Sequence, residues 1–230
     1  MGELVTYQRT ESVAVLRMDD GKVNALSPQM LAELDGALDR ALAEEATVLL
    51  TGRAGVFSAG FDLKVLRAGG ADAFGMLEAG FELSERLLSF PRPVVIASSG
   101  HALAMGSFLL LSTDYRLGAQ GAFRIGANEV AIGMTIPGFG VEICRQRLAP
   151  AHFYRALINA EIYSPDSAVE AGFLDRAVPA AELMDEALRV AAGLAALNMP
   201  AHAATKLRVR AQALQAIRRA IEEDNAGWRP

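Results

Sequence analysis

"TVLLTG" (residues 47–52) and "PVVIAS" (residues 93–98) are short apolar runs, each bounded by glycine or proline. Such runs are typical of strands that are covered on both faces of a sheet. A helical stretch around residues 71–90 separates them. The chain therefore alternates strands and helices around a largely buried sheet, which predicts an α/β fold.

The same alternation extends towards the N-terminus. "SVAVLRMDD" (12–20) is rich in β-branched residues and ends in a polar turn, which predicts a strand. "SPQMLAELDGALDRALAEE" (27–45) begins with Ser27 as a helix cap and Pro28 at the first helical position. Its apolar residues recur at helical spacing: Met30, Leu31, Leu34 and Leu38.

Towards the C-terminus, a glycine-bounded apolar segment (100–114) is followed by a strand-like "YRLGA" (115–119). From about Pro137 the pattern becomes mostly helical, with "DRAVP" (175–179) as a break. The predicted helices cover residues 137–148, 150–160, 165–171, 180–197 and 201–224.

The last predicted helix carries a basic cluster, defined as Lys206, Arg208, Arg210, Arg218 and Arg219. Such a cluster is either a solvated helix face or a contact for phosphate groups.

The composition fits one large soluble domain, with 52% hydrophobic and 21% charged residues among 230. The net charge is −5, and the few aromatic residues are not interleaved with basic ones, so a nucleic-acid partner is not expected. The single cysteine, Cys144, rules out an internal disulfide framework and predicts a buried thiol. The first residues do not resemble a signal peptide, and no apolar run reaches the roughly 18 residues of a membrane helix. We therefore expect a cytoplasmic protein that is not bound to a membrane.

Several familiar motifs are absent from the sequence. GxGxxG, the Walker A motif and HExxH do not occur, and Val56 stands where a GxSxG motif around Ser58 needs its first glycine. The three histidines, His101, His152 and His202, are scattered. We therefore expect neither a nucleotide cofactor nor a metal ion.

Two glycine-containing turns each lead from a strand into an apolar or helical stretch: "FSAGFDLK" (57–64) and "GHALAMGS" (100–107). Such turns can leave backbone N–H groups unpaired at the start of a helix, where they favour an anion. Each turn is equally compatible with a mere tight connection. If the two turns meet, they form an oxyanion hole.

The segment "GANEVAIGMTIPGFG" (126–140) places a lone acid, Glu129, in an apolar loop. A glutamate is seldom buried unless it is paired or used in chemistry. Glu129 is therefore either a surface or helix-capping acid, or a base that removes a proton next to a carbonyl group.

Five segments together resemble the successive motifs of the crotonase superfamily of enoyl-CoA hydratases and isomerases, over roughly residues 10–210. They are "KVNALS" (22–27), "TGRAGVFSAGFDLK" (51–64), "GHALAMGSFLLLSTDYRLGA" (100–119), "FRIGANEVAIGMTIP" (123–137) and "SAVEAGFLDRAVP" (167–179). The resemblance implies a ββα spiral core over 1–195 and a C-terminal helical segment over 196–230 that takes part in trimerisation and closure of the CoA pocket. It also implies a homotrimer or hexamer acting on an acyl-CoA thioester, with coenzyme A as part of the substrate and no separate cofactor.

Matched to the family's motifs, the oxyanion donors are the N–H groups of Phe61 and Met105. The family usually has glycine at the second position, so the Met105 side chain must point away or line the acyl pocket. The resemblance assigns substrate contacts to these two residues and to Ala25, Ala59, Asp62, Leu63, Lys64 and Phe108. Asp62 is equally compatible with a helix cap, and the basic cluster with CoA phosphates.

The family's hydratases hold a water between two glutamates, one in the loop that matches Glu129 and one on the helix three residues past the second donor. Phe108 occupies that helix position here, and a phenyl ring cannot orient water. The lone acid resembles the single catalytic glutamate of the mitochondrial-type Δ3,Δ2-enoyl-CoA isomerases, so we expect Glu129 to shuttle the proton. Apolar neighbours such as Val130 and Phe108 are expected to raise its pKa.

Two other readings stay open. One is an enoyl-CoA hydratase or dehydratase with a rearranged water site, for which Glu142 is a candidate second carboxylate. The other is an acyl-CoA-binding protein with little turnover.

Overall fold

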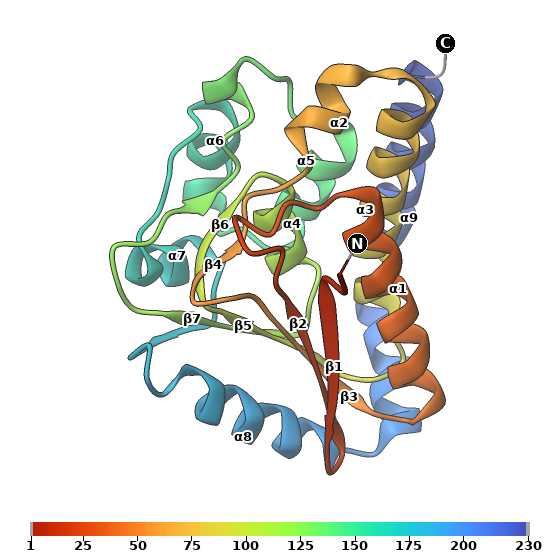
Figure 1. Ribbon diagram of the computed structural model, residues 1–230, viewed down its shortest axis with the longest axis vertical. Helices are drawn as coiled ribbons and strands as arrows, with labels where there is room; N and C mark the ends of the chain where they lie inside the picture. The colour runs from red at the N-terminus through yellow and green to blue at the C-terminus, as the bar shows by residue number, and fades with distance from the viewer. Residues whose placement is uncertain (1, 229–230) are drawn as a thin grey trace.

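The computed structural model describes residues 2–228, with only the backbone of Trp228, and shows an α/β fold with a helical C-terminal region (Figure 1). Its larger sheet has six strands in the order β1-β2-β3-β5-β7-β9. β1 is antiparallel to β2, and the other neighbours are parallel. The strands are β1 (Val5–Thr10), β2 (Val13–Met18), β3 (Thr47–Thr51), β5 (Val94–Ser98), β7 (Tyr115–Ala119) and β9 (Arg176–Val178).

A second sheet holds three short parallel strands in the order β4-β6-β8. They are β4 (Gly55–Ser58), β6 (Gly100–Leu103) and β8 (Ile125–Gly126). The two sheets are built in step: the chain passes from β3 to β4, later from β5 to β6, and then from β7 to β8. Each turn of the chain therefore adds one strand to each sheet, which is the predicted ββα spiral.

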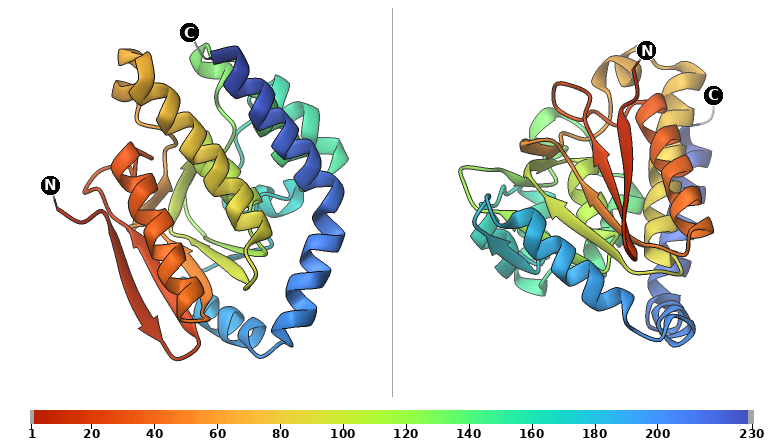
Figure 2. Two further views of the ribbon diagram at one scale, coloured as in Figure 1. Left: turned by 90° about the vertical axis from the view of Figure 1, so that its right-hand side faces the viewer. Right: turned by 60° about the horizontal axis from the view of Figure 1, so that its bottom comes forward.

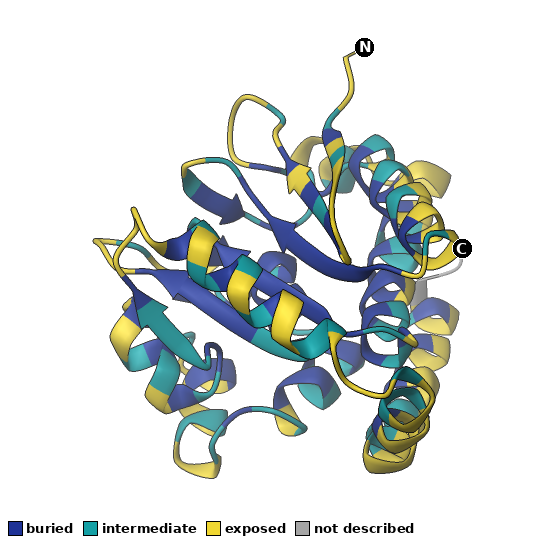
Figure 3. Ribbon diagram, turned by 90° about the horizontal axis from the view of Figure 1, so that it is seen from below, coloured by how far each residue is buried: buried dark blue, intermediate teal, exposed yellow. Residues whose placement is uncertain are grey.

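Helices cover both faces of the six-stranded sheet. The helices of the described chain are α1 (Pro28–Ala43), α2 (Leu63–Ala68), α3 (Gly70–Ser89), α4 (Met105–Leu111), α5 (Gly138–Arg145), α6 (Pro150–Ile158), α7 (Pro165–Ala171), α8 (Leu183–Ala195) and α9 (Met199–Trp228), with a 3₁₀ turn at Val130–Ile132. Buried residues of α8 pack on one face of the sheet in a separate core cluster, and Figure 3 shows this helix lying across the strands. The larger core lies on the other face, under α1 and α3.

The strongest sequence patterns are confirmed. The Ser27 side chain accepts a hydrogen bond from the Met30 N–H at 3.2 Å and caps α1, and the four predicted apolar residues of α1 are buried. The Cys144 thiol is buried as expected.

Two segments differ from the prediction. The sequence pattern did not predict β1, which pairs with β2 along its whole length from Val5↔Met18 to Thr10↔Val13. "DRAVP" is more than a break between helices, because Arg176–Val178 forms β9 and adds the sixth strand beside β7. Three residues are too few to show a strand's alternation, and their partner strand lies far away in the sequence.

The basic cluster divides into two parts: Arg208, Arg218 and Arg219 are exposed, as a solvated face predicts, whereas Lys206 and Arg210 make structural contacts. The Lys206 ammonium donates to Asp114 at 2.6 Å and to the carbonyl of Phe90 at 2.9 Å. Arg210 lies 3.0 Å from the other Asp114 oxygen and donates to the carbonyl of Leu88 at 2.8 Å. The predicted solvated face or phosphate contact is therefore wrong for these two residues, which fasten α9 to the end of α3 and the start of β7.

α9 runs alongside α3 and α5, so the C-terminal segment forms a wall of the body (Figure 2). The predicted boundary at residues 195/196 falls in the turn between α8 and α9. Among the residues that the structure describes, no helix is long and apolar enough to cross a membrane.

Candidate active site

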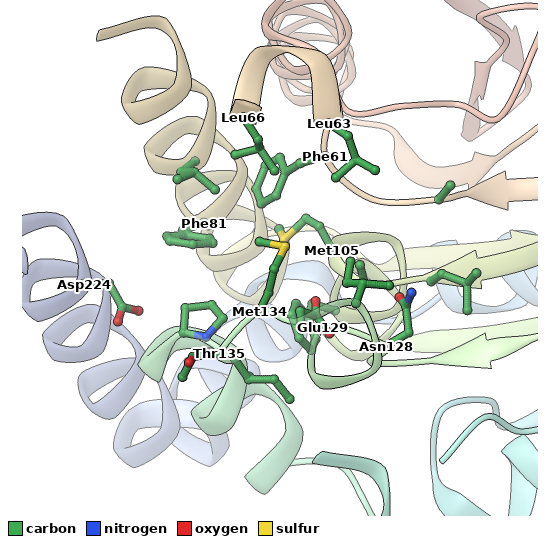
Figure 4. Close-up of a pocket in the computed structure, with 18 of the residues that line it drawn as sticks. Phe61, Leu63, Leu66, Phe81, Met105, Asn128, Glu129, Met134, Thr135 and Asp224 are labelled. Carbon is green, nitrogen blue, oxygen red and sulfur yellow. The ribbon is translucent and has the colours of Figure 1, made fainter. Parts of the chain in front are cut away.

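A pocket of about 880 Å³ opens where the two glycine-containing turns, the loop after β8 and α9 come together (Figure 4). Its wall is mostly apolar, with Phe61, Phe81, Met105 and Phe108 among its lining residues. Glu129 and Asp224 are the carboxylates that reach it from the described part of the chain. A mostly apolar lining with a few polar groups is typical of a small-molecule binding site.

The first turn connects β4 to α2 and aims the amide of Phe61. The N–H of Leu26 donates to the Gly60 carbonyl at 2.9 Å, and the N–H of Asp62 donates to the Leu26 carbonyl at 3.4 Å. In this parallel bridge the residues on either side of Phe61 make the bonds, so its own N–H points the other way. Gly60 has a φ of +89°, a conformation that glycine adopts without strain.

The second turn connects β6 to α4 and exposes the amide of Met105. This residue begins the helix, so its N–H has no acceptor within α4. The preceding Ala104 has a φ of +50° and donates its own N–H to the Gly126 carbonyl at 3.1 Å. A positive φ is costly for alanine and is tolerated where the surroundings hold it.

The two turns touch each other. A Cβ added to Gly60 would lie 3.1 Å from the Met105 nitrogen and 2.8 Å from the Ala104 Cβ. A Cβ added to Gly106 would lie 2.5 Å from the Ser58 carbonyl oxygen. Within residues 2–228 no acceptor is found for the N–H of Phe61 or of Met105. The structure thus brings both predicted donors together at one pocket.

Glu129 follows β8 at the start of the 3₁₀ turn. Its carbonyl oxygen accepts the N–H groups of Ile132 and Met134 at 3.0 and 2.9 Å, which fixes the loop. The residue is only 6% exposed, and its Oε2 is buried without a hydrogen-bond partner among the described residues. Burial raises its pKa from the ordinary 4.5 to about 7. The alternative of a surface or helix-capping acid is therefore wrong.

Phe108 lies one helical turn past Met105 and is buried in the pocket wall. Its ring packs edge-on against Phe139, with centroids 6.0 Å apart, and a Cβ added to Gly140 would lie 2.9 Å from the ring. The site is therefore apolar where the family's hydratases carry a glutamate. Glu142 does not line the pocket and is bound to Arg145 at 3.2 Å, so its candidacy as a second carboxylate is wrong. Val130 is 46% exposed and is not among the residues that line the pocket.

The remaining predicted contact residues border an adjoining groove of about 1010 Å³. Its lining includes Ala25, Ala59, Phe61, Asp62, Leu63 and Lys64, and it shares Ala59, Phe61 and Leu63 with the pocket. The Asp62 side chain accepts the N–H of Lys64 at 2.8 Å and caps α2. The groove and the pocket therefore adjoin at these three shared residues.

Sequence patterns did not indicate two polar residues of the pocket. Asn128 precedes Glu129, and its Oδ1 is buried without a partner among the described residues. Asp224 comes from α9, 95 positions further along the chain than Glu129. Asn128 could have been noticed because it is next to the candidate base in the sequence. Asp224 could not, because nothing in its local sequence links it to the motifs. No group of three or more histidine, cysteine, aspartate or glutamate side chains in the described residues is placed to hold a metal ion.

Comparison with known proteins agrees with these motifs. A model of the enoyl-CoA hydratase/isomerase family matches residues 8–227. The structure of a Pseudomonas syringae protein of this family superposes with a TM-score of 0.96 at 46% identity, covering 98% of both chains.

Similar proteins carry both functional descriptions. A Mycobacterium tuberculosis protein, described both as an enoyl-CoA isomerase and as a probable enoyl-CoA hydratase, is 47% identical. In the first of its two structures it gives a TM-score of 0.94 and covers 98% of this chain and 99% of its own. Human mitochondrial enoyl-CoA delta isomerase 1 is 30% identical over 212 residues, which cover 90% of this chain and 70% of the human protein. By its sequence, its spiral fold and its motifs, the chain belongs to the enoyl-CoA hydratase/isomerase family of the crotonase superfamily.

Proposed function

We propose that the protein is an enoyl-CoA isomerase that moves the double bond of a 3-enoyl-CoA thioester to the 2-position. One observation carries the proposal: Glu129 is a buried carboxylate with a free oxygen, and Phe108 lines the same pocket at the position where the family's hydratases have a second acid. A single carboxylate suffices to move a proton between two carbons, whereas the hydratases of the family use two.

The proposed reaction needs one base and one oxyanion hole. The Glu129 carboxylate takes a proton from C2, and the electrons of the broken C–H bond form a dienolate whose negative charge rests on the thioester oxygen. The N–H groups of Phe61 and Met105 hold that oxygen, and each such donor contributes on the order of 10²–10³ in rate. The carboxyl group then returns the same proton to C4, which leaves the double bond between C2 and C3.

The electrostatics of Glu129 support both halves of this cycle. With a pKa of about 7, the group is ionised in a large fraction of molecules at neutral pH, and it holds the transferred proton readily. Its apolar surroundings also keep away water that would divert the dienolate.

The second pocket carboxylate does not supply the missing half of a hydratase. Both oxygens of Asp224 accept backbone N–H groups, from Gly138 at 3.0 Å and from Phe139 at 2.8 Å. In Figure 4 its side chain lies far to one side of Glu129, with Phe81 and Met134 between them. This separation supports a reaction with one carboxylate.

The proposal extends to the setting in which the enzyme works. It acts in the cytoplasm as a homotrimer or hexamer, and it needs no cofactor because coenzyme A belongs to the substrate. Light scattering of the purified protein tests the assembly.

Two substrates, offered separately, test the reaction. We expect purified protein to convert a 3-enoyl-CoA into the conjugated 2-enoyl-CoA, and not to add water to a 2-enoyl-CoA. Fast hydration of the second substrate would contradict the proposal and favour a hydratase. Binding of acyl-CoA without reaction of either substrate would favour a binding protein.

A further inference from the structure

The end of the pocket that lies away from the adjoining groove is formed by α9. Asp224 is the residue of this helix that lines the pocket, as far as the structure describes the chain. It is absent from the lining of the adjoining groove, which meets the pocket at Ala59, Phe61 and Leu63. In Figure 4, α9 stands behind Asp224 at the edge of the pocket, so the side chain projects from the helix towards the other lining residues.

Asp224 is held in place by the first amides of α5. Its two oxygens accept the N–H groups of Gly138 and Phe139, at 3.0 and 2.8 Å. A Cβ added to Gly138 would lie 3.3 Å from the nearer oxygen, so the approach is tight. The carboxylate cannot swing aside without leaving two partly buried donors unpaired, which is unfavourable.

Neighbouring contacts make this end of the pocket rigid. The next residue, Asn225, donates from its side chain to Glu78 on α3 at 3.1 Å. Phe139, which Asp224 holds through its amide, stacks on Phe81 with ring centroids 4.4 Å apart. The Asp224 carboxylate therefore lies where α9 packs against α3 and α5.

A side chain fixed at the end of a pocket limits how far a growing hydrocarbon chain can extend into it. Each methylene that enters the apolar pocket strengthens binding by about fourfold. A side chain that two hydrogen bonds hold in place leaves no room for a further methylene, so this gain ends where the hydrocarbon chain meets Asp224. We infer that Asp224 is the specificity-determining residue that sets the longest acyl chain the pocket accepts. This inference rests on the proposed function, because it takes the pocket to hold the acyl chain.

The test is a series of saturated, even-numbered acyl-CoA thioesters from butyryl to palmitoyl, titrated by calorimetry. For the native protein we expect Kd to fall with chain length and then to level off at a limiting length. Asp224→Ala removes three heavy atoms, room for about two methylenes. We therefore expect its limit to be two carbons longer, and the first thioester beyond the native limit to bind up to about fifteenfold more tightly.

Matched variants distinguish a side chain that limits the length of the bound acyl chain from a substitution that only destabilises the fold. Asp224→Asn keeps the volume and one acceptor, so its limit should equal that of the native protein. Glu223→Ala alters an exposed neighbour on α9 whose carboxylate lies 3.7 Å from Arg219, and it should also leave the limit in place. Asp224→Ser serves as a second shortened side chain if Asp224→Ala does not fold.

The outcomes are distinct. An unchanged limit in the shortened variants overturns the inference, as does a shifted limit in Asp224→Asn. Binding of saturated acyl-CoA without isomerisation of any 3-enoyl-CoA overturns the proposed function, while the chain-length series still decides the role of Asp224. Absence of binding at every length overturns both.

Discussion

The loop after β8 and the contact between α9 and α5 each bring one carboxylate to the same pocket. Glu129, in the loop, is buried with one oxygen unpaired, and its pKa is raised to about 7. Asp224, in the contact, accepts two backbone N–H groups. Two carboxyl groups of the same chemistry thus differ in their hydrogen bonding: Glu129 has an unpaired oxygen, whereas both oxygens of Asp224 are paired. The difference teaches that hydrogen-bond donors, more than the pocket itself, decide whether an acid is free to react or serves as structure.

Removing the charge of Glu129 gives the largest expected effect. Glu129→Gln keeps the shape but cannot take a proton, so kcat for isomerisation should fall by about 10²–10⁴. Acyl-CoA affinity, measured by calorimetry, should stay near the native value. Glu142→Gln is the matched control, since that glutamate pairs with Arg145 outside the pocket. Native turnover in Glu129→Gln would remove the residue from the mechanism.

The same substitution should stabilise the protein. Because the folded-state pKa of Glu129 is raised from 4.5 to about 7, ionisation costs the folded state more than the unfolded state. This cost is absent below pH 4.5, grows between the two pKa values and is constant above them. Above about pH 7, Glu129→Gln should therefore raise the free energy of unfolding by about 3 kcal/mol. Urea unfolding at low and high pH measures it, and an equal gain at both would contradict the assigned cause.

The pH profile of the native enzyme offers a third comparison. The basic form of Glu129 is needed, so kcat/KM should fall about tenfold per pH unit below a midpoint near pH 7 and level off above it. Asp224→Asn should leave this midpoint in place. A shifted midpoint in Asp224→Asn would mean that Glu129 alone does not set the profile.

The smallest effect belongs to the stability of the α9 contact. Asp224→Asn turns one of two charge-assisted acceptors into a donor that faces an N–H group, so the free energy of unfolding should fall by about 1–2 kcal/mol. Glu129→Gln and Asp224→Asn thus make the same chemical change with opposite signs above pH 7. Glu223→Gln, on an exposed side chain of the same helix, should change stability by less than about 0.5 kcal/mol.

The two carboxylates also mark what the sequence could predict. Glu129, Phe61 and Met105 stand in short motifs whose local turns place them, and the structure brings all three to one pocket. Asp224 and the buried Lys206 owe their places to the packing of α9 against segments about 90 positions away. Local sequence patterns carry no information about partners so far away in the sequence, so the roles of Asp224 and Lys206 could not be predicted.

Strand prediction failed for a related reason. β9 has three residues and no period of its own, and it becomes a strand only because β7 presents an unpaired edge. α1 has sixteen residues with a cap and a continuous apolar stripe, and it was predicted within two residues at each end. A long helix such as α1 can thus be predicted from its own residues, whereas a short strand such as β9 depends on the strand with which it pairs.

Met105 joins two tasks at one position. Its N–H, aimed by the strained Ala104 turn, belongs to the main chain and survives any replacement of the side chain that the turn tolerates. Its thioether lines the pocket and approaches α3, reaching to 3.7 Å from the place of a Cβ on Gly80. The N–H is therefore retained when the side chain is replaced, while the contribution of the side chain to the shape of the pocket can vary. Substitutions at position 105 offer a route to new substrate preferences that does not dismantle the proposed chemistry.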